Sequence, residues 1–240
     1  MNVINYEVIL GCAGIIIGLL VNLSAEFLPR KYAKTVTKEN QKISILNQMN
    51  YKRIRKILIL ILYAYTTITI GSVSRNGFDF ILTLSLLAYI GLIFIIDLEF
   101  RVIMNSMIIL GVVLGLVFGI NFHGIVNTLQ GGIVGLFVLM VLYYLGRILM
   151  PYLAHLRNHV LNKQALYKND VFLGLIMGLI LGWNGVLNGL LISLLLFGTV
   201  GVFSIIGMIL LDKYDPNLAI PLGPFMVLGV VICLSIHHVL

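Results

Sequence analysis

The sequence predicts an all-α, polytopic membrane protein, and three features of the chain indicate this fold class. Hydrophobic residues make up 60% of its 240 residues and charged residues only 10%, whereas an ordinary soluble domain carries about 25% charge. Apolar stretches recur along the whole chain, many of them close to the 20 or so residues with which a helix spans a bilayer. The segments between these stretches hold most of the Lys and Arg residues. We therefore expect one integral membrane domain over residues 1–240, with no separate soluble domain.

Eight apolar stretches are expected to cross the membrane as helices. The stretch 171–211 is too long for one span, and Gly182-Trp183-Asn184-Gly185 is the expected break between a short sixth span and a long seventh. The expected spans are, by approximate residue number, 6–28, 57–73, 78–96, 106–120, 126–149, 171–183, a seventh that ends near 211, and 221–239.

The positions of the basic residues predict how these spans are oriented. The loop 29–56 holds nine of the sixteen Lys and Arg residues, opposed by Glu39 alone. With eight spans, fifteen of the sixteen fall on the side of this loop, and Arg75 is left on the other side. The positive-inside rule assigns the basic side to the cytoplasm, so the N-terminus and the C-terminus are both expected outside. The same interpretation explains the formal charge of +7 without a nucleic-acid partner.

Two aspartates stand out because each lies where an apolar stretch meets a polar segment. Asp97 follows the charge-free run 80–96, with Glu99 and Arg101 close behind it, and Asp170 opens the sixth span. A carboxylate costs about 2.5–3.5 kcal/mol at mid-membrane on insertion scales and less near the interface. With eight spans both aspartates lie on the cytoplasmic side, so we expect a carboxylate pair there.

Asp170 is expected to face the interior of the helix bundle. Counting back in steps of four from Gly182 passes Gly178 and Gly174 and reaches Asp170, so these four residues share one helix face. A ridge of glycines is expected to press against a neighbouring helix. Ionisable groups within membrane helices generally face protein rather than lipid.

No metal site is expected from the Cys and His residues. Cys12 and Cys233 each lie inside an apolar stretch, without the CxxC spacing of a metal or redox site, and are expected to act as small hydrophobic side chains. His155 and His159 are four residues apart, but no acid or cysteine lies near enough in the sequence to complete a ligand set. His123 is expected to be solvated in a short turn.

Four segments of the chain match, in order, motifs that occur together in one family. Gly18-Leu19-Leu20-Val21-Asn22 through Leu28-Pro29 is similar to G-S-F-L-N…L-P. Residues 97–105 are similar to D-x-[DE]…I-P-N, residues 170–183 to D-V-K-L-x-x-x-x-G-x-x-x-G-W, and residues 220–225 to I-P-F-G-P-F. The chain therefore resembles the prepilin peptidases, membrane aspartyl proteases of the GxGD type that process type IV pilins and pseudopilins.

The chain departs from that family's motifs at several positions. Tyr167 and Asn169 replace both glycines of the G-x-G before the second aspartate, and Phe172 replaces a lysine after it. Asparagine tolerates positive φ better than most residues, so Asn169 is expected to keep part of a turn. Met104 replaces a motif proline, and the loop 29–56 lacks the paired CxxC motifs with which many relatives bind zinc beside their N-methyltransferase activity.

The resemblance implies an intramembrane aspartyl endopeptidase with Asp97 and Asp170 as its catalytic pair and no metal or other cofactor. In such a pair an ionised carboxylate takes a proton from the attacking water, while its protonated partner donates to the carbonyl oxygen. The implied substrate is a prepilin or pseudopilin in the lipid bilayer, cut at its cytoplasmic leader junction. The implied location is the inner (cytoplasmic) membrane. Residues expected to bind substrate or support the site are Glu99, Arg101, Asn105, Asn169, Gly223 and Pro224.

Other functions stay open on the sequence alone. A leader peptidase that also methylates the processed N-terminus, without a zinc motif, fits the same segments. A small proton-coupled transporter also places acids at span ends, but inverted repeats and mid-span acids are expected for it, and the sequence contains neither. An inactive scaffold of pilus or secretion assembly would account for the missing motif glycines. The sequence is compatible with three environments for Glu99, namely contact with a basic leader, a pair with Arg101 and plain solvation. The sequence predicts no oligomeric state.

Overall fold

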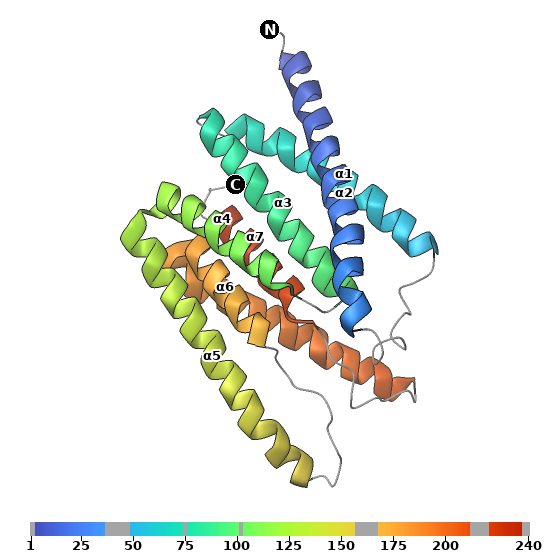
Figure 1. Ribbon diagram of the computed structural model, residues 1–240, viewed down its shortest axis with the longest axis vertical. Coiled ribbons are helices and arrows are strands. Elements are labelled where there is room, and N and C mark those ends of the chain that lie inside the picture. The colour runs from blue at the N-terminus through green and yellow to red at the C-terminus, as the bar shows by residue number, and fades with distance from the viewer. Residues whose placement is uncertain are drawn as a thin grey trace. The chain divides into compact units, whose positions relative to one another are not determined.

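The structure describes residues 3–36, 49–73, 76–100, 103–156, 168–211 and 221–236. Figure 1 shows the computed structural model, in which these residues form seven helices. The chain divides into two compact units, Met1–Val102 and Ile103–Val239, and each unit is described by itself. The first unit holds α1 (Val3–Val36), α2 (Met49–Val73) and α3 (Gly77–Phe100), and the second holds α4 (Asn105–His123), α5 (Ile125–Leu156), α6 (Lys168–Leu210) and α7 (Gly223–Ile236).

The all-helical fold class is confirmed over the described residues. Five helices there are long and apolar enough to cross a membrane, namely α1 over Leu10–Phe27, α3, α4, α5 as far as Leu149, and α6. The helix α7 is apolar but has only 14 residues. The chain is therefore a helical membrane protein, whereas the count of eight spans and the outside location of the termini stay predictions.

Several helices extend beyond the ends that the sequence predicted. The loop expected at 29–56 is wrong at both ends, because α1 continues to Val36 and α2 begins at Met49. Likewise α3 runs to Phe100, so Asp97 lies inside a helix rather than after one. Polarity marks where hydrocarbon gives way to water, but it does not end a helix. Each further residue still adds one backbone hydrogen bond to a helix that has already formed.

In the first unit, α1 packs against α2 and α3, and α2 also contacts α3. Tyr63 of α2 is buried, and its hydroxyl donates a hydrogen bond to the carbonyl oxygen of Leu87 on α3 at 2.9 Å. Its ring occupies the space beside Gly91, where an added Cβ would lie 3.1 Å from the ring carbon Cζ. These contacts hold α3 against α2 in the middle of the helix, well before it reaches Asp97.

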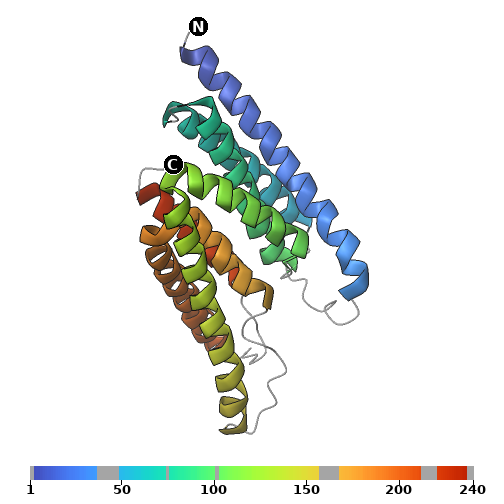
Figure 2. The same ribbon diagram turned by 60° about the vertical axis from the view of Figure 1, so that its left-hand side comes forward.

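The centre of the second unit is α6, since α4, α5 and α7 all pack against it. Figures 1 and 2 show α5 running beside the start of α6. An added Cβ at Gly174 would lie 2.5 Å from the carbonyl oxygen of Gly135, and one at Gly178 would lie 2.6 Å from the carbonyl carbon of Gly131. The backbones of the two helices therefore touch along the glycine face of α6. The expected close packing of that face is confirmed.

The expected break in the long apolar stretch is also confirmed. Gly182 has φ 65° and ψ −177° inside the continuous assignment of α6, and this left-handed φ is open to glycine because it has no Cβ. His123, at the end of α4, lies against this point, and its Nε2 is 3.1 Å from the carbonyl oxygen of Ile180. The expectation of a simply solvated His123 is wrong, because the kink in α6 brings a backbone carbonyl to the ring.

Candidate active site

Asp97 lies in the last turn of α3 and is only 4% exposed. Burial of a carboxylate is expensive unless other groups compensate for the lost solvent. The helix carries it there because the apolar run before it packs against α1 and α2 and continues as one helix through Asp97 to Phe100. The candidate catalytic carboxyl is therefore held on a packed helix rather than on a loop.

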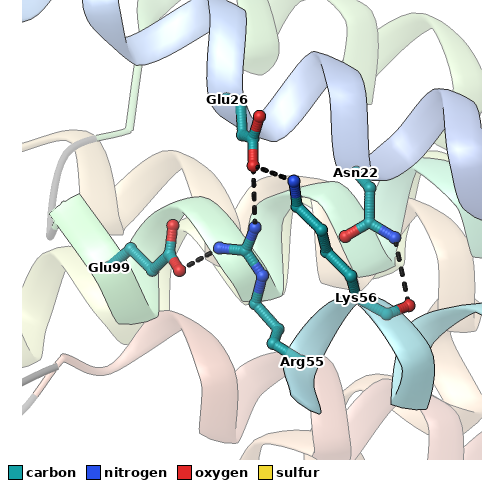
Figure 3. Close-up of polar contacts among 5 residues, drawn as sticks. All are labelled: Asn22, Glu26, Arg55, Lys56 and Glu99. Carbon is teal, nitrogen blue, oxygen red and sulfur yellow. Dashed lines mark hydrogen bonds and ion pairs between the residues drawn. The ribbon is translucent and has the colours of Figure 1, made fainter. Parts of the chain in front are cut away.

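Glu99, two residues after Asp97, is held by an ion-pair cluster between three helices (Figure 3). Arg55 of α2 donates from Nη1 to Glu99 Oε1, and its Nη2 lies 3.7 Å from Glu26 Oε1 on α1. Lys56 Nζ lies 2.7 Å from the same Glu26 oxygen. Asn22 of α1 donates to the Lys56 carbonyl oxygen at 3.4 Å.

This cluster corrects two expectations. Arg55 belongs to the basic loop expected at 29–56, but it lies in α2 and is buried. Glu99 pairs with Arg55 rather than standing open to a basic leader. Arg101, the other partner expected for Glu99, lies outside the described residues. The sequence carried one signal of the cluster, because Asn22 and Glu26 are polar, four residues apart and so on one face of the apolar part of α1, Leu10–Phe27.

Asp170 is the acidic residue in the first turn of α6, and it is partly exposed. The first turn of a helix has unpaired backbone N–H groups and the positive end of the helix dipole, which favour a carboxylate. The local sequence thus places this acid where its charge is stabilised, beside the glycine face that packs on α5.

Asn169 links the two aspartate motifs through a single hydrogen bond. It is the second residue of α6, not part of a turn as expected, and its side-chain Nδ2 donates to the carbonyl oxygen of Ile103 at 2.6 Å. Ile103 and Met104 belong to the end of the first motif, directly before α4. The residue that replaces a motif glycine therefore makes a contact that glycine cannot make.

The remaining expected site residues lie at the starts of two other helices. Asn105 is the exposed first residue of α4, preceded by the N-cap Met104 with φ −82° and ψ 146°. That φ is close to the angle fixed in proline, so methionine keeps the backbone of the motif proline. Gly223 and Pro224 are buried at the start of α7, where the N–H of Phe225 bonds to the Leu222 carbonyl at 3.1 Å.

Asp97 belongs to the first unit and Asp170 to the second, and the position of each is described only relative to the other residues of its own unit. Their convergence into one site stays a prediction. Within the described part of the chain, no group of three His, Cys, Asp or Glu side chains could hold a metal ion.

The fold and these helix-end acids define a class of protein, namely a helical membrane protein with carboxylates placed at the ends of apolar helices. The chain belongs to the type IV leader peptidase family, whose profile matches residues 81–202, about half of the chain. The resemblance to prepilin peptidases is thereby confirmed, and the family indicates a protease. No curated protein and no solved structure matches the chain.

Proposed function

We propose that this chain is an aspartyl endopeptidase of the inner membrane that removes the cytoplasmic leader of type IV prepilins or pseudopilins. One observation carries the proposal: the family match at 81–202 covers both Asp97 and Asp170, and each lies at a helix end, the last turn of α3 and the first turn of α6. In the proposed topology of eight spans with both termini outside, these two ends lie on the cytoplasmic side.

The contact between Asn169 and Ile103 supports the convergence of the two carboxyls. It brings the end of the first motif to the residue next to Asp170. Ile103 follows Asp97 by six residues, and six residues of extended chain reach at most about 20 Å. The covalent chain therefore permits Asp97 to meet Asp170.

The environments of the two aspartates support different roles for them. Asp97 is buried and lies at the C-terminal end of a helix, where the helix dipole opposes negative charge. Asp170 is partly exposed and lies at an N-terminal end, where the dipole favours negative charge. We therefore assign the proton donor to Asp97 and the base to Asp170.

The reaction follows from these roles. Asp170 takes a proton from water, and the water oxygen forms a bond to the scissile carbonyl carbon while Asp97 donates its proton to the carbonyl oxygen. Collapse of the tetrahedral intermediate breaks the C–N bond as the leaving nitrogen takes the proton held by Asp170, and the carbonyl proton returns to Asp97. Two carboxyls that share one proton in this way act as a unit.

The test is cleavage of a co-expressed type IV prepilin that carries a basic leader, followed by gel shift, with the membrane level of each variant measured alongside. Asp97→Asn and Asp170→Asn are each expected to lose at least the 10²–10⁴-fold that acid–base catalysis supplies. Asp79→Asn, at the opposite end of α3 from Asp97, is the matched control and is expected to cleave at the parent rate. Near-parental cleavage by either catalytic variant would refute the aspartyl mechanism.

A further inference from the structure

Buried Arg55 and the partly buried Glu26 and Glu99 form a cluster, here called the Arg55 cluster, at the point where three helices meet (Figure 3). Arg55 lies near carboxylates of two other helices, Glu99 on α3 and Glu26 on α1, whereas the more exposed Lys56 contacts Glu26 alone among these carboxylates. The side chain of Arg55 is 9% exposed and that of Glu99 is 13% exposed. The cluster therefore joins α1, α2 and the last turn of α3 through one guanidinium.

Stability of the fold does not explain this arrangement. Taking ions out of water is costly, and replacing a buried ion-pair group by apolar side chains of similar size is often neutral or stabilising. The hydrogen-bonding of the cluster is also incomplete: among the described residues, Arg55 Nε and Nη2 have no hydrogen-bond partner. A partly satisfied buried network is poorer than an apolar core. A gain in stability is therefore not a sufficient reason for a cluster of this kind.

The helix geometry indicates what it contributes. Successive residues of an α-helix are about 100° apart around the axis and about 1.5 Å along it. Glu99 is thus about 200° around α3 from Asp97 and about 3 Å further along it. The turn that holds both is the last of α3, whose final carbonyl groups lack partners within the helix. The contacts with α1 and α2 hold Glu99 on one side of α3. They therefore also fix the direction in which the Asp97 carboxyl projects from the opposite side of that helix.

We propose that Arg55 is a positioning residue for Asp97, acting through Glu99. It sets the rotation of the last turn of α3, so that the Asp97 carboxyl leaves the helix in the orientation that catalysis needs. This inference rests on the proposed function. It also removes Glu99 from leader recognition, because the carboxylate is already engaged by Arg55.

The decisive variant replaces the whole cluster by apolar side chains: Glu26→Leu, Arg55→Met and Glu99→Leu together. We expect its melting temperature in detergent to be equal to or above that of the parent. Its kcat on a purified type IV prepilin with a basic leader should fall at least about tenfold, because small misplacements of a catalytic group cost up to about 100-fold. KM should stay within about twofold, since no substrate contact is removed.

Two single variants sharpen the test. Arg147→Met is the control, because Arg147 lies on α5 in the second unit and its side chain is exposed; we expect a kcat close to that of the parent. Arg55→Lys keeps the charge without the planar fork that reaches both carboxylates, and we expect its kcat to lie between those of the parent and the triple variant.

Each result decides between distinct conclusions. A stable triple variant with parental kcat overturns the positioning role while leaving the proposed function intact. A triple variant that unfolds shows that the cluster serves stability, which also overturns it. As a positive control, the same assay is run with a peptidase that is known to cleave the prepilin. If that peptidase cleaves the prepilin and the parent chain does not, the proposed function is refuted, and the positioning role falls with it.

Discussion

Replacing Gly178 by alanine is expected to force α5 and α6 apart. An added Cβ would lie 2.6 Å from the carbonyl carbon of Gly131 and 3.0 Å from Cα of Gly132, and it would approach the Gly131 carbonyl oxygen more closely still. Ordinary contact begins at 3.4 Å, so the helices must separate by at least about 0.8 Å. All three obstructing atoms belong to the backbone, which cannot rotate away as a side chain can. Overpacking of this kind costs typically 1–3 kcal/mol.

For a chain of this size 1 kcal/mol corresponds to about 2–4 °C in melting temperature, so a cost of about 2 kcal/mol predicts a fall of about 6 °C for Gly178→Ala. The assay is thermal unfolding of the purified protein in detergent. Gly198→Ala is the matched control on the same helix, because nothing lies within 4 Å of its added Cβ and alanine is the better helix former. It should melt at or above the parent temperature. Equal melting of parent and Gly178→Ala would refute the close backbone contact between the helices.

Three further outcomes are expected. Asn169→Ala should slow prepilin cleavage several-fold, because it removes the hydrogen bond to the Ile103 carbonyl and such a bond is worth about 0.5–1.5 kcal/mol. Asn188 is exposed on the same helix, so Asn188→Ala should cleave at the parent rate. Equal rates for the parent and both variants would contradict the role of Asn169. Single cysteines at Asn40 and Asn76 of a cysteine-free chain should react with an impermeant label from opposite sides of the membrane, and reaction of both from outside would contradict the topology. The purified protein should hold no stoichiometric zinc, since a structural zinc site needs four ligands; one zinc per chain by elemental analysis would contradict this.

The sequence by itself determined the class of the protein and several of its local features. Composition and long apolar runs predicted helices, because in a bilayer a helix satisfies its own backbone hydrogen bonds. The break at Gly182 followed from residues that permit left-handed backbone, and the packing face of α6 from glycines four residues apart. Asp97 and Asp170 were found because a carboxylate beside an apolar run is costly wherever the chain folds. All of these are properties of a residue and its near neighbours in the chain.

Only the tertiary structure decided which polar groups meet. Arg55 looked like one more basic loop residue, and Glu99 had a nearer candidate partner in the sequence; their pairing joins residues 44 positions apart. Asn169 looked like a weakened turn, but it bonds to Ile103 across 66 positions. Helix ends were also misplaced at 29–56, since hydropathy reports the edge of the membrane and not the end of a helix. Such partners depend on how the helices pack, and packing is set by the shapes of many distant side chains together rather than by any one stretch of sequence.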